Sequence, residues 1–322
     1  MLHLFKSIIG GRIMVELTGH HHISMYTKDA RVNKQFYTDV LGLKLVEKTV
    51  NQDNPKMYHL FYGDESGQPG TLLTFFEIPM AGAMRKSTNY ISRLCMLVPD
   101  EQSLDYHQAR LASYDITSQR DTYLGLPALY FEDRDGLSLV LVANDTHNYP
   151  HAWQPYSEST VPREYQIMGM GPVEFILQKL EPTQQFLESR LGYKVKSQNP
   201  LVYTLDSEGL YSDIVLIQKD GAMTKPGRGY VHHIALATPN ANSLAEIYHM
   251  IDQLPHKNSG IIDRYFFKSL YYRQNSILFE FATTDPGFTV DTAVEDLGKH
   301  LNLPDFLEQD RSEIEINLKD LD

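Results

Sequence analysis

Two pairs of adjacent histidines begin two strand-like segments that lie far apart in the chain. His21 and His22 stand in GHHHIS, and His232 and His233 stand in VHHIALAT. Successive side chains on a β-strand point to opposite faces, so one histidine of each pair is expected to face a common cavity. Imidazole is a frequent metal ligand and a proton carrier near neutral pH, so these pairs are candidates for metal binding or acid–base chemistry.

A carboxylate is available to complete such a site. Glu280 lies in the middle of SILFEFA, an otherwise apolar strand-like run. Burying a carboxylate there is costly unless it is paired or bound to a cation. Two imidazoles and one carboxylate match the facial triad of non-haem Fe(II) oxygenases. A single histidine on a strand is more often a hydrogen-bonded structural residue, and spacing alone leaves both interpretations open.

At these residues the sequence resembles a known family. The matching stretches are LTGHHHIS (17–24), YHLFYGDESGQPGT (58–71), GYVHHIALATP (229–239) and the run from Arg264 through Tyr271 to Glu280. In this order they resemble the ring-cleaving, extradiol-type dioxygenases of the vicinal oxygen chelate superfamily, also called the glyoxalase/bleomycin resistance/dioxygenase superfamily. The hydroquinone dioxygenase type is the most similar, and the resemblance spans residues 17–288.

The resemblance implies a fold and a metal site. The fold is α+β, with four βαβββ modules paired into two vicinal oxygen chelate domains with curved mixed sheets. The implied metal ligands are His22, His233 and Glu280, and the implied metal is Fe(II), with Mn(II) as the alternative. One ligand comes from the first module and two from the last, so we expect the two ends of the chain to meet.

The resemblance also implies the reaction and the residues around the metal. The reaction is ring cleavage of a hydroquinone- or catechol-type aromatic diol by O₂, and the implied oligomer is a homodimer. The implied catalytic residues are His21, His232, Arg264 and Tyr271, with Ser24 beside them. Tyrosine and histidine can move protons, and an arginine can stabilise developing negative charge. We expect no organic cofactor, because the chain has neither a G-x-G-x-x-G motif nor a phosphate-binding loop.

Two rival functions fit the same fold. One is a glyoxalase-type metal-dependent isomerase or thiol transferase, whose sites usually add a fourth protein ligand. The other is a non-catalytic small-molecule binding protein, which would lack the metal triad. Metal identity together with O₂ uptake separates these alternatives.

Elements recur along the chain in the order strand, helix and then about three strands. The predicted leading strands cover 21–26, 91–98, 172–178 and 230–238. Helices are predicted over 29–41, 101–113 and 241–251, with Asp29 as an N-cap residue. Further strands are predicted over 43–50, 57–62, 71–78, 128–132, 138–142, 265–273 and 276–282, bounded by Asn, Asp, Gly and Pro.

An internal repeat supports this division. The pattern F-x4-L-G-x-K occurs at 36–44 and again at 186–194. We divide the chain into an extension (1–13), an N-terminal domain of two modules (14–145), a linker (146–167), a C-terminal domain of two modules (168–288) and an acidic tail (289–322). The tail is expected to pack as a helix or strap.

Composition excludes several functions for this chain. The 322 residues carry a net charge of −12, which disfavours nucleic acid and anionic membranes as partners. No apolar run reaches the length of a membrane span. The single cysteine, Cys95, excludes an intramolecular disulfide and fits a cytoplasmic protein; we expect it to be a small core residue. Glu77, in TFFEIP, mimics the position of Glu280 but is not expected to bind metal, and 58–65 is expected to be mainly a structural strand and turn.

Overall fold

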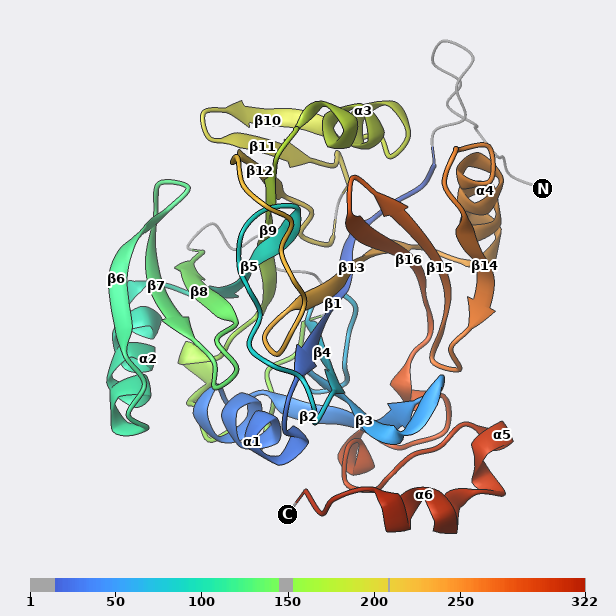
Figure 1. The fold of residues 1–322 in the computed structure, drawn as a ribbon. Coiled ribbons are helices and arrows are strands. Elements are labelled where there is room, and N and C mark those ends of the chain that lie inside the picture. Colours follow the sequence, from blue (N-terminus) through green and yellow to red (C-terminus); the bar gives the residue numbers. More distant parts are fainter. Residues whose placement is uncertain (1–14, 145–152, 208, 322) are drawn as a thin grey trace, which may run out of the picture.

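The computed structural model describes residues 15–144, 153–207 and 209–321, and it contains two eight-stranded mixed sheets (Figure 1). The predicted extension, 1–13, lies outside the described residues, as does part of the predicted linker. The predicted α+β fold of repeated βαβββ modules is confirmed. No helix in the described part of the chain is long and apolar enough to cross a membrane.

The first sheet combines the first and fourth modules. Its strand order is β14-β15-β16-β13-β1-β4-β3-β2. In chain order the strands are β1 (Gly19–Thr27), β2 (Lys44–Asn51), β3 (Asn54–Gly63), β4 (Leu72–Glu77), β13 (Val231–Thr238), β14 (Asn258–Asp263), β15 (Phe267–Gln274) and β16 (Ile277–Pro286). The leading strands β1 and β13 pair antiparallel at its centre. The two ends of the chain therefore meet in one sheet, as expected.

The second sheet combines the second and third modules in the same way. Its order is β10-β11-β12-β9-β5-β8-β7-β6. The strands are β5 (Tyr90–Val98), β6 (Ser118–Tyr123), β7 (Leu126–Glu132), β8 (Ser138–Ala143), β9 (Gly169–Leu177), β10 (Lys194–Gln198), β11 (Leu201–Thr204) and β12 (Ile214–Gln218). Each sheet thus takes one module from either half of the chain. The predicted boundary between an N-terminal and a C-terminal domain, each continuous in sequence, stays a prediction. Each hydrogen-bonded sheet contains strands from both sides of that boundary.

One helix follows each leading strand and lies on the outside of its sheet (Figure 1). These are α1 (Ala30–Gln35), α2 (Glu101–Ser113), α3 (Glu181–Ser189) and α4 (Ala241–Ile251), and α1 continues as the π-helical turn η1 (Phe36–Val40). Asp29 caps α1, because its carboxylate accepts a hydrogen bond from the Val32 amide. The repeated Leu-Gly of the sequence ends two of these helical segments. Gly42 and Gly192 both have positive φ, +73° and +76°, a backbone conformation that favours glycine.

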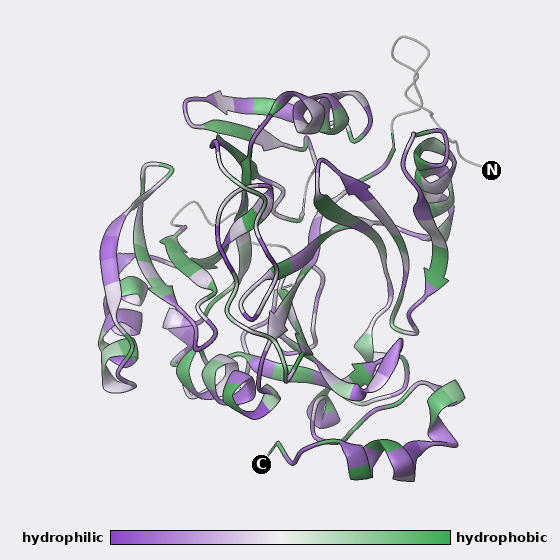
Figure 2. Ribbon diagram, in the orientation of Figure 1, coloured by the Kyte–Doolittle hydropathy of each residue, from purple (hydrophilic) through white to green (hydrophobic). Residues whose placement is uncertain are grey.

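The acidic tail forms the expected strap. Its helices α5 (Asp305–Glu308) and α6 (Arg311–Asn317) lie below β2 and β3 in Figure 1. Hydrophilic and hydrophobic residues alternate along α6 (Figure 2), and its buried Ile314 joins Leu303 and Leu307 in a cluster with Val50 of β2. This apolar contact holds the tail on the outside of the sheet.

Candidate metal centre

His22, His233 and Glu280 meet on one face of the first sheet, as the resemblance implied. His22 is on β1, His233 on β13 and Glu280 on β16, which are neighbouring strands. Glu280 Oε2 lies 2.8 Å from His233 Nε2 and 3.1 Å from His22 Nε2, and the two Nε2 atoms are 3.2 Å apart. All three side chains are buried. They are a group of His and Glu residues whose ligand atoms can hold one metal ion.

The spacing of these three atoms fits one face of an octahedron. A metal with bonds of about 2.1 Å separates neighbouring ligand atoms by about 3.0 Å in an octahedron and by about 3.4 Å in a tetrahedron. The observed separations of 2.8–3.2 Å match the octahedral value. Glu280 Oε2 is buried and accepts no hydrogen bond from any described residue. A buried carboxylate oxygen without a donor is costly, and a cation bound there removes that cost.

The charge state of the triad suits a cation. Burial raises the pKa of Glu280, but the neighbouring His22 and His233 outweigh it and hold the pKa well below its usual range, so the carboxylate is ionised. The other oxygen of Glu280, Oε1, accepts a hydrogen bond from the Ser269 hydroxyl. Burial lowers the pKa of His233, which favours the neutral imidazole that metals bind.

Two β-bulges place the histidine pairs, and they correct the expectation of strict alternation. In the β1–β13 pairing, His20 and His22 oppose consecutive residues of β13, so His21 is an extra residue on β1. A second shift makes His232 the extra residue on β13. A bulge redirects the side chains around it and is frequent beside active sites. As a result His21 hydrogen-bonds to His22 and His232 lines the same pocket as His233, instead of pointing away.

The main-chain carbonyl of Thr283 determines, through His21, which ring nitrogen of His22 is available to a metal. His21 Nε2 lies 3.1 Å from the carbonyl oxygen of Thr283, so this nitrogen must carry a proton and donate it. Burial lowers the pKa of His21 to about 3, so its imidazole is neutral and its Nδ1 is an acceptor. His22 Nδ1 is 2.9 Å from His21 Nδ1 and must donate to it. With Nδ1 committed to His21, Nε2 is the nitrogen of His22 that can bind a metal beside Glu280.

His232 supports His233 by the same contact. The two Nδ1 atoms are 2.9 Å apart, and burial lowers the pKa of His232 to about 3. If His233 binds metal through Nε2, its Nδ1 carries the proton and donates it to His232. The neutral His232 then presents Nε2–H to the pocket. Tyr26 stacks on His232, with ring centroids 5.2 Å apart, and limits how the imidazole can turn.

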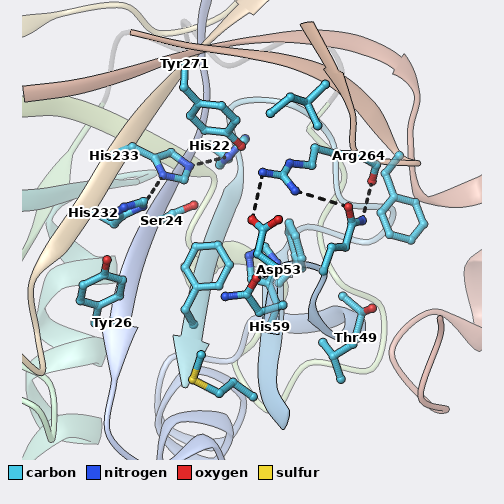
Figure 3. Close-up of a pocket in the computed structure, with 18 of the residues that line it drawn as sticks. His22, Ser24, Tyr26, Thr49, Asp53, His59, His232, His233, Arg264 and Tyr271 are labelled. Atoms are coloured by element: carbon cyan, nitrogen blue, oxygen red, sulfur yellow. Dashed lines mark hydrogen bonds and ion pairs between the residues drawn. The ribbon is translucent and has the colours of Figure 1, made fainter. Parts of the chain in front are cut away.

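Arg264 and Tyr271 line the same pocket (Figure 3). Tyr271 pairs with Glu280 across the β15–β16 ladder, and its ring packs edge-on against His233 at 5.5 Å. The guanidinium of Arg264 lies 5.7 Å from the Tyr271 ring centroid and 3.5 Å from an Asp53 carboxylate oxygen. Burial and the Glu280 charge raise the pKa of Tyr271, so the phenol keeps its proton at neutral pH.

The metal position opens into a cavity of about 490 Å³. Most of its wall is aromatic or aliphatic, which suits an aromatic ring. The apolar lining residues are Val50, Met57, Phe61, Phe76, Ile78, Ile262, Phe266, Phe267 and Leu278. Figure 3 shows His22, His232 and His233 at one end of this cavity and Asp53 nearer the other.

Sequence reasoning missed several residues of this site. Phe267 packs against the His22 ring at 5.3 Å, and Ser269 binds Glu280. Both alternate with Tyr271 along β15, so the period-two rule applied to the predicted strand identifies them. His59 lines the pocket, although its segment was expected to be mainly structural.

Cys95 and Glu77, which were not expected to bind metal, lie outside the metal site. Cys95 is fully buried in the second sheet, as expected for a small core residue. Glu77 accepts a hydrogen bond from the Ala30 amide at 3.1 Å and so anchors the start of α1. Neither belongs to the group of side chains that can hold a metal.

Comparisons with known proteins identify the class that this fold and site define. The family model described as "Glyoxalase/Bleomycin resistance protein/Dioxygenase superfamily" matches residues 19–141, and the chain belongs to this superfamily. Within it, the chain is 40% identical to "Putative ring-cleaving dioxygenase MhqA" of Bacillus subtilis, over 95% of this chain and 99% of that one. It is 28% identical to "Chlorohydroquinone/hydroquinone 1,2-dioxygenase" of Sphingobium indicum, over 92% and 94% of the two chains.

Solved structures share the fold. The crystal structure of a "putative dioxygenase" from Bacillus subtilis superimposes with a TM-score of 0.88 at 28% identity, covering 96% of this chain and 98% of that one. Glyoxalase I from Zea mays superimposes with a TM-score of 0.58 at 14% identity, covering 83% and 92%. The second likeness concerns the fold alone. A putative dioxygenase and a glyoxalase I therefore share this architecture, and the fold alone does not assign a reaction.

Proposed function

We propose that this chain is an Fe(II)-dependent dioxygenase that opens the ring of a hydroquinone- or catechol-type diol. The observation that carries the proposal is that His22, His233 and Glu280, which would hold the metal, meet at a cavity lined largely by aromatic and aliphatic side chains. The ring-cleaving and hydroquinone dioxygenases to which the chain is similar supply the reaction class. Bound iron would supply the one-electron chemistry that lets O₂ react with an aromatic ring.

The protein residues hold the substrate and manage its protons. Phe61, Phe76 and Phe267 form apolar walls that orient the ring and exclude water. His232 offers its Nε2–H as a hydrogen-bond donor near the metal position, and Arg264 stabilises negative charge that develops on oxygen. Tyr271 holds a proton on a phenol that faces the pocket, which makes it a candidate general acid.

His21 acts on the metal site through its hydrogen bond with His22. It does not line the pocket; it accepts the His22 Nδ1 proton and donates to the Thr283 carbonyl. This arrangement orients the His22 ring and increases the basicity of its free nitrogen, as outer partners of metal-bound histidines commonly do. We therefore assign His21 a positioning role. A homodimer, Mn(II) as an alternative metal and a cytoplasmic location stay predictions from the sequence.

The rival activity is that of a glyoxalase-type isomerase. Such sites usually carry a fourth protein ligand, and the group that the described residues offer has three. The pocket is also lined largely by aromatic and aliphatic side chains, which suit a small aromatic ring. Both features favour the dioxygenase.

Anaerobic reconstitution followed by oxygen measurement tests this proposal. The metal-free protein is loaded with Fe(II), and O₂ consumption is recorded with hydroquinone, with catechol and with a glutathione hemithioacetal. We expect iron-dependent O₂ uptake with a diol and no conversion of the hemithioacetal. Isomerisation of the hemithioacetal without O₂ uptake would overturn the proposal.

A further inference from the structure

We propose that Ser24, Thr74 and His59 form a proton relay along one wall of the pocket. The relay takes a proton from the hydroxyl of a para-diol that lies far from the metal and delivers one beside the metal position. This inference rests on the proposed function and deepens it, because it assigns the residues that handle the second hydroxyl of a para-diol. It also assigns His59 and Thr74 roles that the sequence resemblance did not imply.

Two hydrogen bonds connect the three side chains. Ser24 Oγ lies 2.6 Å from Thr74 Oγ1, and Thr74 Oγ1 lies 3.2 Å from His59 Nε2. Ser24 and Thr74 are fully buried. A contact of 2.6 Å between two hydroxyl oxygens requires a proton between them, so each bond in the chain has a donor and an acceptor.

The strand register places the two ends of the relay at different distances from the metal position. Ser24 follows the ligand His22 by two residues on β1, so both side chains share a face, and it pairs with His233 of β13. Thr74 on β4 pairs with Ser24, and β3, which carries His59, lies next to β4. His59 is therefore two strands from β1, or about 9.6 Å along the sheet.

The structure holds the His59 ring in place. It stacks on Phe76 with ring centroids 3.9 Å apart and contacts Phe61 at 4.1 Å. Among the described residues, Thr74 is its only hydrogen-bond partner, through Nε2, so Nδ1 has no protein partner although the residue lines the pocket. Figure 3 shows His59 near Asp53, away from His233. Burial holds the pKa of His59 well below its usual value, so the ring is neutral.

Two proton arrangements of the relay are chemically equivalent. In the first, His59 Nε2–H donates to Thr74 and the Thr74 hydroxyl donates to Ser24, which leaves Nδ1 as an acceptor and the Ser24 proton facing the pocket. In the second, every bond is reversed. Going from the first to the second, Nδ1 takes the substrate proton, Nε2 gives its proton to Thr74, Thr74 gives its own to Ser24, and Ser24 releases one. One proton enters and one leaves, and no residue changes its charge.

The relay suits a diol whose oxygens lie at opposite ends of the ring. One oxygen sits at the metal position beside Ser24, and the other meets His59 Nδ1. An ortho-diol carries both oxygens toward the metal and leaves Nδ1 without a partner. We therefore expect selectivity for para-diols, because a polar group left unpaired in a buried site costs binding free energy.

Ligand binding without O₂ tests the His59 end of the relay. Dissociation constants for hydroquinone and phenol, which lacks the second hydroxyl, are measured on the Fe(II)-loaded protein and on His59→Phe, which keeps the ring stack. A hydrogen bond of about 1–1.4 kcal/mol predicts that the wild type binds hydroquinone about five- to tenfold more tightly than phenol. The ratio should fall to within about twofold in the variant. An unchanged ratio in the variant, or no preference in the wild type, overturns the proposal.

Turnover tests the middle of the relay. Thr74→Val removes only the bridging hydroxyl, and Thr74→Ser restores it as the matched control. We expect Thr74→Val to lower kcat on hydroquinone by about 10²-fold while iron content is retained, and Thr74→Ser to recover most of this loss. Equal kcat values in the valine and serine variants contradict a relay through this hydroxyl.

The two proposals fail in different ways. If the iron-loaded wild type takes up no O₂ with any diol, the dioxygenase proposal fails, and the binding ratios still decide the role of His59. If O₂ uptake is normal and the His59→Phe ratio is unchanged, only the relay fails.

Discussion

At the scale of single residues, the site depends on which nitrogen of each histidine carries a proton. The Thr283 carbonyl sets the proton on His21, and His21 in turn sets the proton on His22. His22 Nε2 is thereby the ring nitrogen available at the metal position. Glu280 supplies the negative charge, and its Oε1 is held by Ser269.

Replacing Glu280 tests this arrangement. Glu280→Gln keeps the shape and the contact with Ser269 but removes the charge that attracts a cation. We expect the variant to remain folded in the metal-free state, because glutamine fills the same buried space. Iron content, measured by elemental analysis after reconstitution, should fall close to zero. Glu77→Gln is the matched control and should retain iron; full iron occupancy in Glu280→Gln would show that the triad is wrong.

A second substitution separates proton transfer from metal binding. Tyr271→Phe keeps the ring that packs on His233 and removes the hydroxyl. If the phenol donates a proton, kcat should fall by about 10²–10⁴-fold with iron content unchanged, and KM should change less. Steady-state kinetics on the iron-loaded variant provides the measurement. A kcat within about twofold of the wild type means that Tyr271 is only a packing residue.

At the scale of elements, the C-terminal strap covers a buried acid on β2. Glu47 is buried beneath the tail, and its only described partner is the Asn302 side-chain amide, 3.4 Å from Oε2. Burial raises the pKa of Glu47 from 4.5 to about 8. The folded protein therefore holds a proton on Glu47 at neutral pH that the unfolded chain does not hold.

This proton makes stability depend on pH. Between the unfolded pKa of 4.5 and the folded pKa of about 8, the folded state binds more protons, so stability falls as pH rises through this window. Glu47→Gln cannot titrate and should escape the effect. We expect its Tm advantage over the wild type to grow between about pH 5 and about pH 8.5, by about 2–4 °C for each kcal/mol involved. Parallel Tm profiles would contradict a buried, protonated Glu47.

The elements also show how far the sequence can predict this structure. Helices α2 and α4 match the predicted residues, because Asp100 and Asn240 provide side-chain caps at their first turns. Strands β6 and β14 were missed: both are short, polar edge strands, SQRDTY and NSGIID, without an alternating apolar pattern.

The metal ligands could be predicted from the sequence. The contacts of the residues around them were harder to predict. The triad follows from residue types and the family resemblance. The roles of His21 and His232 depend on two bulges, and strict alternation cannot predict a bulge. His59 and Thr74 lie on strands whose pairing with β1 is a tertiary feature, so the sequence gives no direct signal that their side chains meet.

At the scale of the whole molecule, the sheet order explains why a metal site needs both ends of the chain. Strands β1 and β13 pair at the centre of the first sheet, and they carry one histidine ligand each. The second sheet has the same order of elements, but the corresponding strands β5 and β9 carry Arg93 and Glu174, which form an ion pair at 3.3 Å. One sheet therefore offers a metal site at its centre, whereas the buried Glu174 at the centre of the other is paired with the half-buried Arg93.

Isotope labelling distinguishes ring cleavage by O₂ from simple oxidation of the diol. The iron-loaded protein is supplied with ¹⁸O₂ and hydroquinone, and the product is analysed by mass spectrometry. A ring-cleaving dioxygenase predicts a ring-opened product that contains both atoms of one ¹⁸O₂ molecule. Simple two-electron oxidation of the diol would instead accumulate the corresponding quinone without ¹⁸O. That result would contradict a ring-cleaving dioxygenase.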